Sequence, residues 1–388
     1  MNHLSKGISG VKKIRDDDIV RPHLKTGLFG SIDYEIDYQF SRSQKKSLGP
    51  VGYYASQVAK EVIEKSGLDQ EFISSGRMGV AFGSTHGSPL VQRKLYKDFF
   101  SEGFSPSKLN PASYLQTLTH TTAANIASIF NITGRVISSC TACTTSSQSI
   151  GLGYEAIKHG IQDAMICGGA DELDTMTVLV FDKLLASSVE YNESPHKSPR
   201  PFDKNRDGLV VAEGAGAILL EEYEFAKKRG ANILGEVIGF ASSCNGGNLI
   251  NPDVKGVKQN LQMGLDSAKI NSDDVDFISA HATSTRIGDV VEAESIYEIY
   301  KDHPSVTAFK SFMGHTMSSC GAIESIITLY MMEDNLIIPT LNLDDIDEQC
   351  AMISHTPAVE ERKINIASIQ NFAFGGVNTS LFIKRPEQ

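Results

Sequence analysis

The chain has 388 residues, of which 41% are hydrophobic and 21% charged, the usage of an ordinary globular protein that folds throughout. This length favours two domains or two fused halves of one large domain. The formal net charge of −11 argues against a nucleic acid partner, because neutralising phosphates requires a basic surface.

Nothing in the sequence indicates secretion or insertion into a membrane. The N-terminus lacks the regions of a signal peptide, and apolar runs such as Ile326–Met332 fall far short of the roughly 20 residues of a membrane helix. Six irregularly spaced cysteines are too few for a disulfide scaffold in so long a chain and fit a reducing compartment. We therefore expect a soluble cytoplasmic protein without a membrane partner.

Helices and strands alternate from residue 51 onward. Hydrophobic periodicity and turn residues predict, in chain order, a helix at Val51–Lys65 that ends at Gly67, a strand at Arg77–Gly83, a helix at Thr121–Phe130 and a strand at Val136–Ser139. A helix at Cys143–Lys158, with small residues in its first turns, and an apolar strand at Ala164–Gly168 follow. Strand, turn, helix and strand in this order form the unit of a layered parallel α/β fold.

A second series follows the charged segment Glu221–Arg229. It consists of a strand at Asn232–Gly239, a helix near Val257–Ala268, a strand at Phe277–Ala280 and a helix near Asp289–Tyr300. The stretch Gly314–Leu329 has the same pattern as the Cys143 helix, with small residues first and a packed face after them. We predict two similar α/β halves, residues 1–225 and 226–388, with Cys143 in the first half.

Cys143 is the strongest candidate for a nucleophile. Its place at the start of a helix predicts an ionised thiolate, since unpaired N–H groups and the helix dipole favour negative charge there. A buried structural cysteine is the alternative. Cys140 and Cys143 also form a C-x-x-C, which could be a redox dithiol or half of a zinc site, but the chain has no second C-x-x-C or histidine pair at ligand spacing.

Two of the ten histidines stand out as proton handlers for acyl transfer. His281 follows the predicted strand Phe277–Ala280, and His315 lies just before a small-residue helix, five residues after Lys310. Ligands gather at the carboxyl ends of strands in layered α/β folds, which favours both as site residues over satisfied surface or core groups.

These motifs give the chain a resemblance to a known family, the elongating β-ketoacyl-acyl carrier protein synthases of the thiolase superfamily. The resemblance extends from about Gly7 to Lys384. It depends on Thr141-Ala-Cys-Thr144, Gly168-Gly-Ala-Asp171, Arg200-Pro-Phe-Asp-Lys-Asn-Arg-Asp-Gly208, Glu213-Gly-Ala-Gly216, Ala280-His-Ala-Thr-Ser-Thr285, Lys310-Ser-Phe-Met-Gly-His315, Gly321-Ala-Ile-Glu324 and Asn371-Phe-Ala-Phe-Gly-Gly-Val-Asn378.

The resemblance implies a thiolase-like fold, with duplicated α/β halves in a layered α-β-α-β-α arrangement, and a Cys-His-His triad at Cys143, His281 and His315. Cys143 would take an acyl group from the phosphopantetheine thioester of an acyl carrier protein, with the thioester oxygen held by the backbone N–H groups of Cys143 and Phe372. The histidines would assist decarboxylation of a malonyl thioester, whose enolate then attacks the acyl-cysteine. The family requires no metal or redox cofactor, because its substrates carry the phosphopantetheine.

The resemblance also implies supporting residues. Lys310 would pair with Glu324 and orient His315, and Thr283 and Thr285 would bind the pantetheine arm. Phe372 would gate the pocket in front of the flexible Gly375-Gly376 turn. Asp289 and Phe374 complete the expected supporting set. Taken singly, these residues could equally be a surface ion pair, a turn and a core aromatic.

The expected partners are an acidic acyl carrier protein and a second synthase subunit, either another copy in a homodimer or a sister ketosynthase in a heterodimer. Basic residues at Arg42, Lys45, Lys46 and Arg206 are candidates for docking the carrier protein. A solvated helix face is the alternative interpretation of the cluster at residues 42–46.

The chain also departs from the family pattern. Its opening residues resemble the end of the family's first helix, which suggests that an N-terminal piece, including the first strand, is missing. Ala282 replaces a glycine, and Thr316–Cys320 replaces a more apolar stretch, so we expect a different pocket shape. Two other functions stay open: a non-catalytic partner that shapes the pocket of a sister subunit, as chain-length factors do, and a degradative thiolase or coenzyme A-primed synthase.

Overall fold

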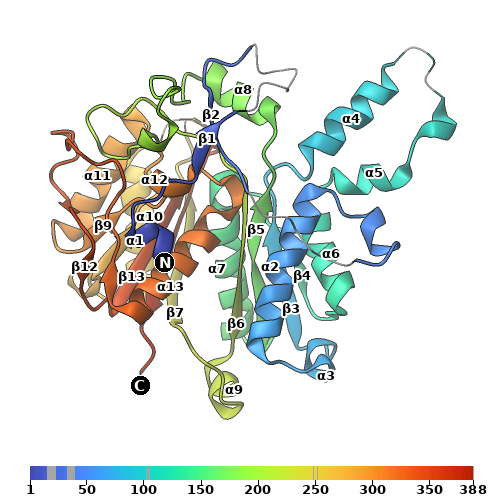
Figure 1. The fold of residues 1–388 in the computed structure, drawn as a ribbon. Coiled ribbons are helices and arrows are strands. Elements are labelled where there is room, and N and C mark those ends of the chain that lie inside the picture. The colour runs from blue at the N-terminus through green and yellow to red at the C-terminus, as the bar shows by residue number, and fades with distance from the viewer. Residues whose placement is uncertain are drawn as a thin grey trace.

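The structure is a computed structural model, and it describes residues 1–14, 23–32, 40–101, 103, 105–247, 249–250 and 252–387. Two sheets dominate it (Figure 1). The strands of the first sheet are β3 (Met78–Gly83), β4 (Val136–Ile137), β5 (Ala164–Asp171) and β6 (Gly214–Glu221). Those of the second are β7 (Glu236–Cys244), β8 (Phe277–Ser279), β9 (Ser305–Thr307), β11 (Ser354–His355), β13 (Ile366–Phe372) and β14 (Val377–Lys384).

Four neighbouring strands follow the same order in both sheets, β4-β3-β5-β6 in the first and β9-β8-β13-β14 in the second. The first runs β4-β3-β5-β6 and the second β11-β9-β8-β13-β14-β7 among the described residues. In each sheet the central strands are parallel and the next strand, β6 or β14, is antiparallel to its neighbour. The second sheet continues with β7, which pairs antiparallel with β14. The predicted duplication of α/β halves is therefore confirmed.

Helices form three layers around the two sheets, as Figure 1 shows. The inner layer, between the sheets, holds α7 (Thr145–Lys158) and α13 (Cys320–Asp334). The outer layers hold α2 (Pro50–Ser66) and α6 (Thr121–Phe130) against the first sheet, and α10 (Val254–Ala268) and α11 (Arg286–Tyr300) beside the second. This is the predicted α-β-α-β-α arrangement.

Shorter elements surround this frame. The helices are α1 (Asn2–Ser5), α3 (Gln70–Ile73), α4 (Pro89–Phe99), α5 (Pro111–Gln116), α8 (Thr175–Lys183), α9 (Tyr223–Lys228) and α12 (Lys310–Met313). The strand pairs are β1 (Val11–Lys13) with β2 (Leu28–Gly30), and β10 (Leu336–Ile337) with β12 (Glu360–Glu361). In the described part of the chain, no helix combines the length and the apolar character needed to cross a membrane.

Both inner helices begin in the same way. A 3-10 turn, Ala142–Thr144, leads into α7, and a second, Met317–Ser319, leads into α13. Ala142 and Met317 have left-handed φ values of 49° and 54°, which L-residues adopt at an energetic cost and which often occur at functional sites. The two turns face each other and place the first residues of both helices at one point between the sheets.

Most predicted elements lie where the sequence places them. The helix at Thr121–Phe130 is reproduced, because Asn131 adopts the left-handed conformation that ends it. The predicted strand at Asn232–Gly239 is shifted: β7 begins only at Glu236, and residues 232–235 form an irregular segment. Cys143 lies in the 3-10 turn, one turn ahead of the regular helix.

Candidate active site

Three side chains from distant parts of the chain meet between the two inner helices. The Sγ atom of Cys143 lies 3.0 Å from Nε2 of His315. The sulfur and one ring nitrogen of each of His281 and His315 lie within 4.8 Å of one another, and all three residues are buried. The imidazole rings are 5.5 Å apart and nearly perpendicular. The structure thus brings together the predicted triad residues.

Burial, however, keeps the Cys143 thiol neutral at rest. Burial raises the pKa of Cys143 to about 11, although the charge of Lys310 and the backbone N–H groups of Phe374 and Cys143 oppose the shift. A helix N-terminus contributes at most about 2 kcal/mol in favourable sites, less than the desolvation of a thiolate at this depth. The prediction of an ionised resting sulfur was wrong for this reason.

The backbone fixes the tautomer of His315. The N–H of Met317 donates to Nδ1 of His315 over 3.1 Å, and Sγ of Cys320 lies 3.2 Å from the same nitrogen. An Nδ1 atom that accepts a hydrogen bond leaves the ring proton on Nε2, the atom that faces Cys143. Burial and the charge of Lys310 lower the pKa of His315 to about 3, so the imidazole is a neutral N–H donor.

His281 is oriented in a similar way by Asn371. Nδ2 of Asn371 lies 3.4 Å from Nδ1 of His281, which again assigns the ring proton to Nε2. Burial, with the charge of Lys310, lowers the pKa of His281 well below its ordinary value. The carboxylate of Glu292 accepts the backbone N–H groups of His281 and Ala282 and so holds the end of the β8 loop in place.

Lys310 and Glu324 form the predicted pair, and it lies in the interior. Nζ of Lys310 is 2.5 Å from Oε1 of Glu324, with 1% and 0% of the two side chains exposed. The other oxygen of Glu324 accepts from Asn371 over 2.7 Å, and Asn371 also bonds Ser147 of α7. Lys310 makes no hydrogen bond to His315 among the described contacts. Its influence on that ring is electrostatic, and Met317 orients the ring.

Phe374 is better placed than Phe372 for the two roles that the sequence suggested for Phe372, the backbone N–H donor and the gate. The backbone N–H that reaches the Cys143 sulfur, beside that of Cys143 itself, belongs to Phe374. Phe372 lies opposite Asn378 in the β-ladder, and its buried ring packs 5.8 Å from His281, so it can neither provide that N–H nor swing as a gate. Phe374 is 38% exposed and precedes Gly375 and Gly376, whose φ values of 96° and 74° require glycine.

Arg206 is a structural residue, which corrects its assignment to carrier-protein docking. It is 3% exposed, and its guanidinium donates to the carboxylate of Asp347 and to the backbone oxygens of Asp203, Thr285 and Arg286. Docking needs an exposed cation, and this one is fully engaged in holding the loop after His281.

The loop after His281 carries the remaining predicted residues. The hydroxyls of Thr283 and Thr285 lie 3.1 Å apart and are partly exposed. Asp289 is buried and accepts the N–H groups of Ser284 and Phe202, so it shapes the loop without reaching the sulfur. The other docking candidates, Arg42, Lys45 and Lys46, are exposed on and beside a short 3-10 turn.

The sequence did not single out Asn371 and Glu292, which orient the histidine at position 281. Asn371 was visible only as the first residue of a glycine-rich motif. Glu292 follows Asp289 by one helical turn, and two acids on one buried face of a helix are a signal that could have found it.

Family models and known proteins identify the family to which this chain belongs. The β-ketoacyl synthase N-terminal domain matches residues 2–226, and the β-ketoacyl synthase C-terminal domain matches residues 234–344. The chain belongs to the β-ketoacyl synthase family. It is an acyltransferase of the ketosynthase class with a thiolase-like fold.

The similarity to known ketosynthases covers nearly the whole chain. The 3-oxoacyl-[acyl-carrier-protein] synthase 1 of Haemophilus influenzae is 31% identical and covers 98% of this chain, with 93% of the relative matched. A β-ketoacyl synthase crystal structure from Burkholderia phymatum has 36% identity and a TM-score of 0.94, and covers 100% of this chain and 94% of its own. A type II polyketide ketosynthase, solved in complex with its acyl-carrier protein, has 25% identity and a TM-score of 0.90 over 100% of this chain and 94% of its own.

Proposed function

We propose that this ketosynthase condenses an acyl group, carried on Cys143, with a malonyl group on acyl carrier protein and releases 3-oxoacyl-acyl carrier protein and carbon dioxide. The reaction would serve fatty-acid, polyketide or aryl-polyene synthesis. The observation that carries the proposal is the 3.0 Å contact between the sulfur of Cys143 and an imidazole whose other nitrogen accepts a backbone N–H.

The first step is transfer of the acyl group. The Cys143 sulfur attacks the thioester carbonyl, the bond to the pantetheine sulfur breaks, and the thiol proton leaves with the pantetheine. The backbone N–H groups of Cys143 and Phe374, which already point at the sulfur, suit the oxygen of the tetrahedral intermediate. Once acylated, the sulfur carries no charge, which suits its buried position.

The second step uses the two neutral histidines. The carbon–carbon bond to the malonyl carboxylate breaks, carbon dioxide leaves, and the electron pair forms an enolate on the thioester. The Nε2–H groups of His281 and His315 would donate to the enolate oxygen. The enolate carbon then attacks the acyl-Cys143 carbonyl and expels the thiolate. Because the pKa values of both rings are lowered, both imidazoles are uncharged. They can therefore donate hydrogen bonds without being repelled by the ammonium of Lys310.

We propose further that the reaction needs no metal or redox cofactor. Cys143, His281 and His315 are close enough to ligate a cation, but a metal at Nε2 of His315 would require its proton to move to Nδ1. Nδ1 already faces the N–H of Met317, and the ammonium of Lys310 lies close enough to affect both rings. These groups disfavour a cation.

The proposed partners follow from exposed features. Arg42, Lys45 and Lys46 would dock the acidic carrier protein, while Thr283 and Thr285 would receive its pantetheine arm. A homodimer is favoured over a sister-subunit heterodimer, because this chain assembles its own triad. The exposed edge at β4, where Val136 is 47% exposed, offers a surface for the second subunit. Six free cysteines support a cytoplasmic location.

Intact-mass spectrometry with acyl carrier proteins of several chain lengths tests the function. The protein should gain the mass of the acyl group, and Cys143→Ala should not. Malonyl-carrier protein should then release carbon dioxide. A Cys143→Ala protein that elongates chains as fast as the wild type would exclude the mechanism. Activity only with a sister synthase, unchanged by Cys143→Ala, would instead indicate a non-catalytic partner subunit.

A further inference from the structure

Two buried polar side chains cross from one half of the molecule to the other at the active site. Asn371, near the end of β13, accepts the hydroxyl of Ser147 at the start of α7 and also orients His281. Asp171, the last residue of β5, accepts the N–H of Ser318 over 2.9 Å, in the 3-10 turn that leads into α13. β5 and β13 hold the same position in the two sheets, so each of these strands reaches the start of the other half's inner helix.

Asp171 joins three segments of the chain. Besides Ser318, its carboxylate accepts the hydroxyl of Ser84 over 2.7 Å and the N–H of Thr85 over 3.0 Å, both in the loop after β3. The residue is 3% exposed. An ideal Cβ at Gly169 would lie 2.6 Å from the backbone oxygen of Ser318, so a side chain at that position would push the turn away from β5. The Gly-Gly-Ala-Asp motif therefore fits the end of β5 against this turn.

The turn that Asp171 holds is also the one that fixes a catalytic imidazole. Met317, directly before Ser318, donates its N–H to Nδ1 of His315 over 3.1 Å. Its φ of 54° is a strained conformation, which persists only where surrounding contacts hold it. The bond from Ser318 to Asp171 is such a contact, because it anchors the next N–H of the same turn.

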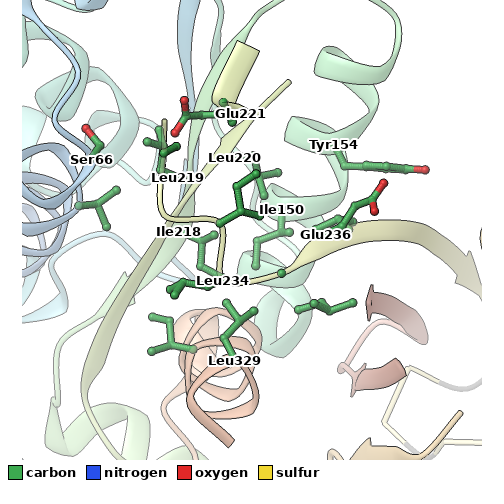
Figure 2. Close-up of a pocket in the computed structure, with 18 of the residues that line it drawn as sticks. Ser66, Ile150, Tyr154, Ile218, Leu219, Leu220, Glu221, Leu234, Glu236 and Leu329 are labelled. Atoms are coloured by element: carbon green, nitrogen blue, oxygen red, sulfur yellow. The ribbon is translucent and has the colours of Figure 1, made fainter. Parts of the chain in front are cut away.

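A groove borders the inner helices on the side of β6. Its volume is about 1250 Å³, and its lining includes side chains of α7, α13 and residues 231–238. Figure 2 shows Ile150 and Tyr154 of α7 and Leu329 of α13 beside it. Because this side of the two helices borders a cavity rather than close-packed side chains, polar contacts at the helix starts are needed to fix where the helices begin.

We propose that Asp171 is a positioning residue of the reaction: it holds the turn at Met317 so that the backbone N–H stays on Nδ1 of His315. The ring proton then stays on Nε2. The proposed function, on which this role depends, requires the proton there for donation to the enolate. Asp171 thus does for one imidazole what Asn371 does for the other.

Asp171→Asn tests this role, because an amide has one acceptor oxygen where a carboxylate has two. If the oxygen faces Ser84 and Thr85, the amide NH₂ faces the N–H of Ser318, and the two donors repel each other. The kcat for carbon dioxide release from malonyl-carrier protein should fall roughly 100-fold, the cost of displacing a catalytic group by about 1 Å. The KM for malonyl-carrier protein should not change, because Asp171 is buried.

Nitrogen NMR spectra of labelled histidine report the tautomers directly. In Asp171→Asn, His315 should lose its fixed Nε2–H form, whereas His281, which Asn371 orients, should keep its own. Asp276→Asn is the matched control. Asp276 also accepts two backbone N–H groups, but at the start of β13, the opposite end of the strand from the active site. This control should change neither ring and should release carbon dioxide like the wild type.

Two results with Asp171→Asn would overturn the proposal. One is a folded protein that releases carbon dioxide as fast as Asp276→Asn. The other is loss of the Nε2–H form in both histidines together, which would indicate a general disturbance of the site.

Hydrogen exchange of the wild type decides the case in which Asp171→Asn does not fold. The amide of Ser318 should be as protected as the amides inside α13, and exchange as fast as that of an exposed amide would refute the role of Asp171. A wild-type protein that releases no carbon dioxide would instead contradict the proposed function, and the tautomer comparison would still test the position of the turn.

Discussion

Removing Lys310 tests whether its buried ion pair organises the active site. In Lys310→Met, Glu324 remains fully buried, and the Asn371 amide is the one side-chain partner left to its carboxyl group among the described residues. Breaking a buried pair by deleting one member costs about 3–5 kcal/mol. A chain of 388 residues has an unfolding entropy of about 0.8 kcal/mol/K, so the melting temperature should fall by about 4–6 °C.

Two further variants separate stability from chemistry. Lys310→Met combined with Glu324→Gln removes both charges and preserves an acceptor for Asn371, so stability should return to within about 1.5 kcal/mol of the wild type. Lys258→Met removes one member of a pair whose side chains are 35% and 48% exposed, and should cost less than about 1 kcal/mol.

The assay combines thermal or denaturant unfolding with carbon dioxide release from malonyl-carrier protein. Both Lys310 variants should release carbon dioxide more slowly than the wild type, because the ammonium that helps to keep both imidazoles neutral is gone. The reasoning fails if Lys310→Met is as stable as Lys258→Met. It also fails if the double variant is less stable than the single one.

Three other predictions follow from individual contacts. The pKa of Cys143 is about 11, so its thiol is protonated at neutral pH. Its rate of alkylation by iodoacetamide should therefore increase about tenfold with each pH unit between pH 7 and 10. A rate that stops increasing below pH 9 would contradict this. Asn371→Asp removes the donor to Nδ1 of His281 and should slow decarboxylation roughly 10²- to 10⁴-fold by changing the tautomer, while acylation measured by mass spectrometry is unchanged. Arg206→Met should lower the melting temperature, whereas Arg42→Ala should raise the KM for carrier protein without changing stability; the opposite pattern would restore Arg206 as a docking residue.

Local sequence patterns predicted helices and strands well where nearby residues determine the ends of the element. The helix that ends at Asn131 is an example, because the left-handed residue marks its end. The strand expected from Asn232 was misplaced because Ile233 and Leu234 are apolar for another reason: they line the groove beside β6. Apolar character alone does not distinguish a residue within a strand from one that borders a cavity.

The active site, too, was predicted only in part from the sequence. Motifs located the triad, but they did not show whether Phe372 or Phe374 provides its backbone N–H to the sulfur. That choice depends on where β13 stops pairing with β14, since Phe372 lies within the ladder and Phe374 beyond it. Asn371 escaped notice because its partner, His281, is 90 residues away and only the parallel pairing of β13 with β8 brings them together.

The neutral resting site raises the question of whether so weakly acidic a thiol can serve as a nucleophile. Ionising a group of pKa about 11 at pH 7 costs about 5 kcal/mol. A turnover of roughly 10 s⁻¹ corresponds to a barrier of about 16 kcal/mol, so about 11 kcal/mol remains for bond formation. The proton also need not be lost to solvent, because the departing pantetheine sulfur can take it up. Burial at Cys143 is therefore compatible with catalysis, and it favours the acylated sulfur, which is uncharged, over the free thiolate.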